Sequence, residues 1–148
     1  MNARIPLRLQ SIALFAAMLF ALATPVSASA PNRHHGSVSL ANAVQGTWEQ
    51  VWPQLADHER AVKLINATHF SWTHWDTGTH HVIATAGGPY TLVGQDYCEQ
   101  LLFAQGGVES ASGRVLSFRV QVKGDSLIQL GPAASDGARS REIWRRLR

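Results

Sequence analysis

From Gln45 onward, hydrophobic and polar residues alternate in short runs that Gly, Asp, Asn or Pro interrupts every eight to twelve residues. This spacing is typical of an all-β sandwich or barrel. No segment in this region carries an apolar stripe at helical spacing for more than about two turns, which is too short for an amphipathic helix. The candidate strands are GTWEQVW, AVKLIN, HFSWTHW, HHVIATA, PYTLV, DYCEQLLFA, VLSFRVQV, SLIQLG and SREIWRRL.

The clearest strand is VLSFRVQVK, in which apolar and polar side chains alternate along its length. Leu116, Phe118, Val120 and Val122 fall on one face, and the polar residues between them fall on the other, because successive strand side chains point to opposite faces. The dipeptide GD follows and is a strong hairpin signal before SLIQLG. We therefore expect a sheet with one face on a core and the other in water.

Short turns between about eight to nine strands predict an antiparallel meander. In a domain of this size, closing the meander into an up-and-down barrel removes both exposed sheet edges. A barrel of about eight strands has room for one small ligand. The predicted fold is therefore an all-β, antiparallel up-and-down barrel over residues 45–148.

The segment before the predicted barrel has a different composition. MNARIPLRLQ carries two arginines, and the apolar run SIALFAAMLFALA and the small-residue tract TPVSASA follow it. Together they predict a signal peptide over residues 1–28, cleaved after Ala28. Residues 29–44 are polar and small, as in a flexible leader. Cys98 is the single cysteine, so no internal disulfide is possible, and we expect a periplasmic or secreted protein with the periplasm favoured.

Charge and motifs exclude several function classes. The formal net charge is +3, and removal of Arg4 and Arg8 with the signal peptide lowers it to +1, so no nucleic-acid partner is expected. The sequence has no G-x-S-x-G elbow, and the glycine-rich AGGPY opens no helix that would bind phosphate. Gly87 and Gly88 are expected to form a tight turn or bulge between two strands. No catalytic residue and no cofactor are predicted, and a binding protein is favoured over an enzyme.

Five segments of residues 45–147 together resemble the bacterial lipocalin-like proteins of the calycin group, which are small secreted barrels. The segments are QGTWEQV, KLINATHFSW, GGPYTLVGQDYCE, KGDSLIQLG and REIWRRL. The resemblance implies that Trp48 lies on the first strand at the closed end of the barrel. It also implies that an arginine near the last strand, Arg145 or Arg146, packs across that ring. With Trp144 of the same closing segment, these residues form the predicted barrel-closing set.

The segment HFSWTHWDTGTHH, residues 69–81, holds four of the seven histidines. If DTGT forms the turn, His74 pairs with His81 across the hairpin and the four histidines divide equally between its two faces. His74 and His81 are then the only pair placed to chelate a metal ion, and a tight site needs a third or fourth ligand. We favour an aromatic, imidazole-rich hairpin near the barrel mouth over a metal or haem site.

A few polar groups in an apolar lining fix the orientation of a bound ligand. On DYCEQLLFA, Glu99 shares a face with Tyr97, Leu101 and Phe103. An inward Glu99 needs a partner, for which Gln129 and an inward arginine are candidates, whereas the alternative is that Glu99 faces water. The predicted lining residues are Phe70, Trp72, Tyr90, Tyr97, Glu99, Phe118 and Gln129.

The leading hypothesis is an exported barrel that binds a small apolar or amphipathic molecule. The second is a metal- or haem-binding envelope protein that uses His74 and His81. The third is a non-catalytic envelope interaction module whose barrel is filled by side chains. A small hydrophobic molecule is the expected partner, no membrane span is expected in the mature chain, and the oligomeric state stays open.

Overall fold

The computed structural model describes residues 39–148. The signal peptide and most of the leader predicted from the sequence lie outside the described residues. The elements are α1 (Leu40–Ala43), β1 (Gly46–Trp52), β2 (Glu59–Ile65), β3 (His69–Asp76), β4 (Val82–Val93), β5 (Asp96–Gln100), β6 (Phe103–Gln105), the 3₁₀ helix η1 (Glu109–Ala111), β7 (Val115–Lys123), β8 (Ser126–Ala133) and β9 (Arg139–Leu147).

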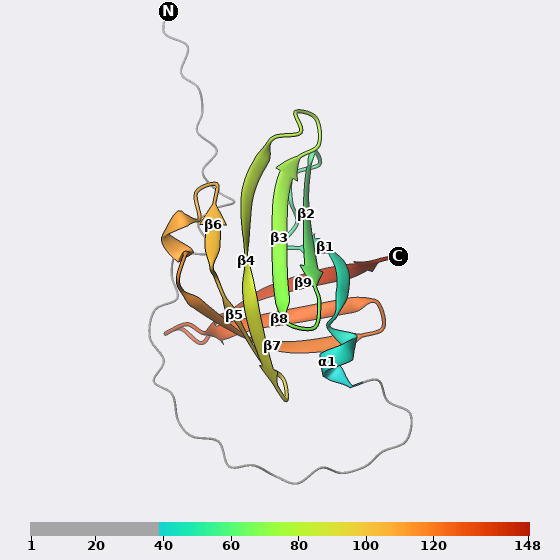
Figure 1. Cartoon of the computed structure of the whole chain (residues 1–148), viewed down its shortest axis with the longest axis vertical. Helices are drawn as coiled ribbons and strands as arrows, with labels where there is room; N and C mark the ends of the chain where they lie inside the picture. The colour runs from blue at the N-terminus through green and yellow to red at the C-terminus, as the bar shows by residue number, and fades with distance from the viewer. Residues whose placement is uncertain (1–38) are drawn as a thin grey trace, which may run out of the picture.

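Eight of these strands close into an antiparallel barrel (Figure 1). Their order is β3, β2, β1, β9, β8, β7, β5 and β4, and β4 pairs back with β3. β6 is an additional strand that pairs with β4 beside the point where β5 leaves it. The ring of eight strands has no free edge, which removes the surface on which another strand could pair. The predicted all-β, up-and-down, lipocalin-like barrel is confirmed.

The two ends of the barrel differ in how the interior is filled. α1 and the turns β2–β3, β4–β5 and β7–β8 lie at one end, which we call the α1 end (Figure 1). The loops β1–β2, β3–β4 and β8–β9 lie at the other, which we call the mouth end. Inward-pointing side chains toward the α1 end are fully buried and form the core, namely Val44, Trp48, Ile65, Phe70, Tyr97, Val120 and Leu127.

The last residues of the predicted leader belong to the folded domain. Ser39 caps the single turn of α1, because its side-chain oxygen accepts a hydrogen bond from the Asn42 backbone N–H at 3.3 Å. Val44 follows this turn and is fully buried. The leader prediction is therefore corrected for residues 40–44. No helix within residues 39–148 has the length and apolar character needed to cross a membrane.

Trp48 and Arg146 close the α1 end, as the family resemblance implies. The Arg146 guanidinium carbon lies 4.0 Å from the centre of the Trp48 ring. The guanidinium also donates hydrogen bonds to the carbonyl oxygens of Gln45 (2.8 Å) and Ala43 (2.7 Å). The Trp48 indole N–H donates to the carbonyl oxygen of Val44 at 2.8 Å. Arg146 and Trp48 therefore provide hydrogen-bond donors for three backbone carbonyl oxygens between α1 and β1, and their side chains cover the core.

The other two predicted closing residues lie elsewhere. Arg145 points outward, and its side chain is mostly exposed. It forms an ion pair with Glu49 at 2.6 Å. Trp144 is buried and lies deeper in the barrel than Trp48, over the Lys63 side chain. Of the two candidate arginines, Arg146 is the one that packs on Trp48.

The prediction of a tight turn or bulge between two strands at Gly87 and Gly88 is wrong, because both lie inside one continuous strand, β4, and pair in register with β3. A Cβ atom on Gly87 would lie 2.8 Å from the Phe103 ring and 2.9 Å from the Phe70 carbonyl oxygen. A Cβ on Gly88 would overlap the Gln100 carbonyl oxygen. The two glycines therefore allow β4 to approach its neighbours closely at the point where its partner changes from β6 to β5.

The predicted single strand DYCEQLLFA is divided into β5 and β6. The chain leaves β5 after Gln100, and the Leu102 backbone N–H then donates to the Gly87 carbonyl oxygen at 2.9 Å. This crossing reverses which side chains point inward. Leu101 is buried like Glu99, but Phe103 is 46% exposed and, contrary to the prediction, does not share a face with Glu99.

Candidate functional site

A cluster of polar side chains lies inside the barrel, where β2, β5 and β8 bring Lys63, Glu99 and Gln129 together. The Lys63 ammonium donates to Glu99 Oε1 at 2.9 Å and to Gln129 Oε1 at 2.7 Å. The exposed fractions of these three side chains are only 2%, 2% and 1%. Glu99 therefore points inward, and its partner is a lysine rather than either predicted candidate, Gln129 or an arginine; Gln129 accepts from the same lysine. Lys63 was not among the residues predicted from the sequence.

Three aromatic rings surround the same ammonium group. The Lys63 Nζ atom lies 4.8 Å from the centre of the Trp144 ring, 5.8 Å from that of Phe70 and 5.9 Å from that of Phe118. Such contacts are worth about 2 kcal/mol when the cation is desolvated. The charge of Lys63 is thus satisfied by two oxygen acceptors and by the faces of the rings.

The contact with Lys63 fixes the orientation of the Gln129 amide. A lysine ammonium group can only donate, so the amide atom that faces it must be the oxygen. The amide nitrogen, Nε2, then faces away and has no hydrogen-bond partner among the described residues. A buried donor without a partner costs about 1–3 kcal/mol. Gln129 therefore presents an unsatisfied N–H₂ group inside the barrel.

The Tyr97 hydroxyl is the second buried polar group without a partner among the described residues. Tyr97 is 1% exposed and lies two residues before Glu99, on the same face of β5. Burial raises the pKa of Tyr97 far above its usual value, and both the negative charge of Glu99 and the closeness of its carboxylate to the hydroxyl add to that effect, although the two groups do not reach hydrogen-bond geometry. The hydroxyl therefore stays protonated and can donate. We refer to Lys63, Glu99, Gln129 and Tyr97 as the buried polar cluster.

Glu142 borders the buried polar cluster from β9, directly opposite Gln129. Its Oε2 atom accepts a hydrogen bond from the Trp144 indole N–H at 3.0 Å. Burial raises the pKa of Glu142, and the charge of Glu99 raises it further, while the charge of Lys63 acts in the opposite direction. Glu142 is thus more easily protonated than an ordinary glutamate.

All seven predicted lining residues point into the barrel. Tyr90 is paired with Glu99, and Tyr97 with Phe118, in registers that place each pair on the inner face. The Tyr90 and Tyr97 rings lie 4.9 Å apart, and the Tyr90 hydroxyl donates to the Asn66 carbonyl oxygen at 2.8 Å. Whether these residues contact a ligand stays a prediction.

The inner face keeps solvent-accessible surface on one side of the buried polar cluster. Inward positions there are half-buried rather than buried, and their side chains are mostly apolar or aromatic. They are Trp72, His74, Leu116, Phe118 and Glu142, whereas the half-buried Tyr90 lies toward the α1 end beside the β2–β3 turn. The barrel therefore combines a packed core toward the α1 end, polar groups in the middle and a partly accessible lining above them. Ligand sites commonly have this composition.

The predicted register of the histidine hairpin is wrong. His74 is paired with Ala84, not with His81, and the register shifts between His74 and Trp75. The loop is longer than a DTGT turn, because the Asp76 carboxylate accepts hydrogen bonds from the backbone N–H groups of Gly78 and Thr79, both at 2.8 Å. Residues 77–81 consequently lie outside the strands.

The metal hypothesis loses the geometry on which it was based. His74 Nε2 lies 3.0 Å from Glu59 Oε2 on the inner face, whereas His81 is exposed in the loop. Among residues 39–148, no group of three or more His, Cys, Asp or Glu side chains could hold a metal ion.

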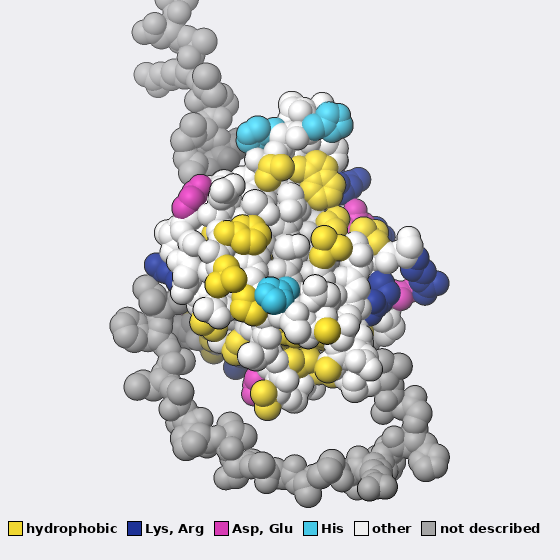
Figure 2. Space-filling model, viewed as in Figure 1, with side chains coloured by type: hydrophobic (Ala, Val, Ile, Leu, Met, Phe, Trp, Pro, Cys, Tyr) yellow, Lys and Arg dark blue, Asp and Glu magenta, His cyan; other side chains and the backbone are white. Residues whose placement is uncertain are grey.

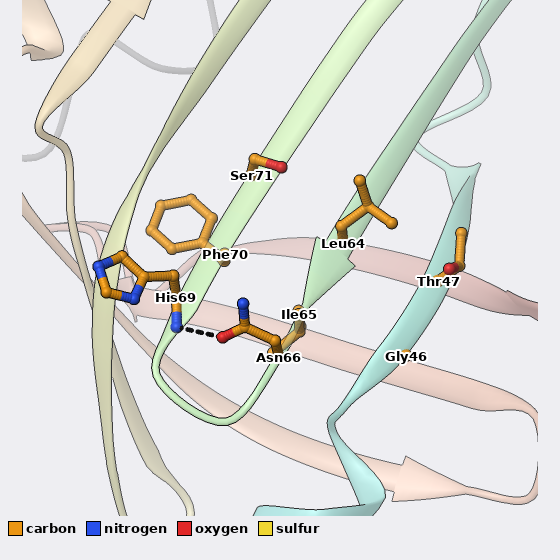
Figure 3. Close-up of a pocket in the computed structure, with 8 residues that line it drawn as sticks. All are labelled: Gly46, Thr47, Leu64, Ile65, Asn66, His69, Phe70 and Ser71. Carbon is orange, nitrogen blue, oxygen red and sulfur yellow. Dashed lines mark hydrogen bonds between the residues drawn. The ribbon is translucent and has the colours of Figure 1, made fainter.

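A separate hollow of about 500 Å³ is lined by residues of β1, β2, the β2–β3 turn and the start of β3 (Figure 3). Its main polar side chain, Asn66, already stabilises that turn. The Asn66 Oδ1 atom accepts hydrogen bonds from the backbone N–H groups of Thr68 (2.9 Å) and His69 (2.7 Å). The hollow is a less specific candidate than the interior, because its polar groups serve the local fold.

The outer face over β2, β3 and β4 carries no continuous patch of charge. Figure 2 shows hydrophobic and histidine side chains scattered over this face, with acidic and basic side chains toward its edges. A nucleic-acid-binding surface would need basic residues clustered on one face. The surface in this view gives no support to a polyanionic partner.

No family model and no curated protein matches the chain. The antiparallel eight-stranded barrel is compatible with a lipocalin-like fold. The fold does not determine the function, so the functional argument depends on the interior residues.

Proposed function

We propose that this chain is an exported, lipocalin-like protein that binds a small amphipathic molecule inside its barrel. The observation that carries the proposal is the buried polar cluster, in which a lysine–glutamate pair and two unsatisfied polar groups lie among aromatic rings. The apolar part of the ligand would contact the half-buried lining, and its polar part would reach the cluster.

Protein stability alone gives a weak reason for this cluster. A buried ion pair is often no more stabilising than apolar side chains of the same volume. The unsatisfied Tyr97 hydroxyl and Gln129 amide nitrogen add a further cost. A barrel that served only as a packed scaffold would be more stable with apolar residues at these positions. A ligand that provides the missing partners explains why they are polar.

Export is part of the proposal and is supported by the composition of the N-terminal segment. A basic stretch, an apolar run and small residues before Ala28 are arranged as in a secretory signal. The fold uses packing and hydrogen bonds, and its one cysteine, Cys98, is free. Such a chain would fold in an oxidising compartment without disulfide exchange.

Native mass spectrometry of the full chain, expressed with its N-terminal segment and recovered from a bacterial periplasm, tests this function. We expect a folded species that carries one small organic molecule, which is released on denaturation. His74→Ala and His81→Ala should retain it. Stoichiometric metal or haem in place of an organic mass would contradict the proposal, as would a species that carries no added mass and binds no amphipathic probe.

A further inference from the structure

We propose that the ligand presents an uncharged hydrogen-bond acceptor, such as the carbonyl of an amide, ester or ketone, to Tyr97 and Gln129. This inference rests on the proposed function and specifies the polar group that the barrel selects. The Gln129 Nε2 atom can only donate, and the Tyr97 hydroxyl is a further donor. A carbonyl oxygen has two lone pairs and can accept from both groups.

The contacts of Lys63 argue against a ligand carboxylate. Its ammonium already donates to Glu99 and to Gln129, and aromatic rings pack around it. A second anion would have to displace one of these oxygen partners to reach the lysine. It would also lie close to the Glu99 carboxylate and beside Glu142. Like charges at close range inside a barrel are strongly unfavourable.

A ligand cation is disfavoured for the opposite reason. The amide nitrogen of Gln129 presents only N–H groups, so an ammonium group would meet a donor instead of an acceptor. The Glu99 carboxylate is already paired with Lys63 at 2.9 Å. A neutral acceptor is the one class that satisfies both unpaired groups and leaves the buried ion pair intact.

Binding of three matched probes, decanamide, decanoate and decylamine, to the exported full chain tests this inference. Intrinsic tryptophan fluorescence or native mass spectrometry can follow each titration. We expect decanamide to bind about tenfold more tightly than the other two, because the carboxylate would lie beside Glu99 and the ammonium would meet the N–H groups of Gln129.

Tyr97→Phe identifies the contact. It removes a hydroxyl that has no partner among the described residues, so the melting temperature should stay the same or rise, while the affinity for decanamide falls about tenfold. Thr91→Val is the control, because it removes a hydroxyl on the exposed outer face of β4, away from the lining. It should leave the affinity unchanged.

The outcomes separate this inference from the proposed function. Tighter binding of decanoate or decylamine would overturn the neutral acceptor but support an amphipathic ligand. Equal decanamide affinity of Tyr97→Phe and the unchanged protein would overturn the Tyr97 contact. If none of the three probes binds and the recovered protein carries no organic mass, the proposed function itself fails.

Discussion

Lys63→Met is expected to lower the free energy of unfolding by about 3–5 kcal/mol, the cost of breaking a buried ion pair by removing one partner. The substitution leaves the Glu99 carboxylate without its cation at a site that is only 2% exposed. It also removes the donor that Gln129 Oε1 requires. Methionine fills a similar volume, so the loss reports electrostatics more than packing. Urea denaturation at neutral pH measures it.

Two further variants make this prediction specific. Lys63→Met combined with Glu99→Leu should recover most of the loss, because an apolar pair can replace a buried ion pair at little cost. Lys123→Met is the matched control, since Lys123 is the only other lysine and is exposed on β7. Its effect should be within about 0.5 kcal/mol. Equal losses in the single and double variants would show that Lys63 and Glu99 are not coupled.

Arg146→Ala is expected to lower the free energy of unfolding by about 2–3 kcal/mol. The variant loses the packing of the guanidinium on Trp48 and two hydrogen bonds to the backbone between α1 and β1. α1 and Val44 should then detach from the barrel before the strands unfold. Denaturant unfolding gives the energy, and amide hydrogen exchange around Val44 reports the local opening.

The adjacent arginine provides the control for Arg146. Arg145→Ala removes an ion pair with Glu49 on a side chain that is 63% exposed, and such surface pairs are worth about 0–1 kcal/mol. The two variants remove the same side chain from neighbouring positions of one strand. A similar loss in both would mean that Arg146 has no special role at the α1 end.

The sequence was most informative where side-chain alternation was regular. VLSFRVQVK predicted β7 with Phe118 and Val120 on the inner face, and the alternation around Glu99 placed Tyr97 beside it. Trp48 followed from the family resemblance, which left Arg145 and Arg146 as alternatives for its partner. These features depend on local periodicity or on a short motif, which a single sequence contains.

Lys63 could not be predicted in the same way, because AVKLIN has apolar residues on both faces of the strand. Val62 and Leu64 point outward, and Leu64 is 52% exposed, while Ala61 and Ile65 flank Lys63 on the inner face. A face that reads Ala, Lys, Ile at alternate positions is the one signal that could have identified it. Its partners, Glu99 and Gln129, lie on other strands, 36 and 66 residues later in the sequence.

The errors at the histidine hairpin and at the glycine pair have nonlocal causes. The Asp76 carboxylate holds a loop longer than the one assumed, and that shifts the pairing of His74. Gly87 and Gly88 suggested a turn or bulge, but their lack of a side chain instead allows β4 to lie close to residues of the neighbouring strands. Loop length and strand approach depend on the closed barrel and are not encoded in the local pattern.

The most direct test of a ligand site in the interior uses the five tryptophan indole N–H groups as reporters in a ¹⁵N-labelled sample. Trp72 and Trp144 lie inside the barrel beside or above the buried polar cluster, Trp48 lies at the α1 end, and Trp52 and Trp75 lie outside the lining. On addition of decanamide, the signals of Trp72 and Trp144 should shift in a saturable manner while that of Trp48 stays in place. Shifts confined to Trp52 and Trp75 would place binding on the surface and contradict an interior site.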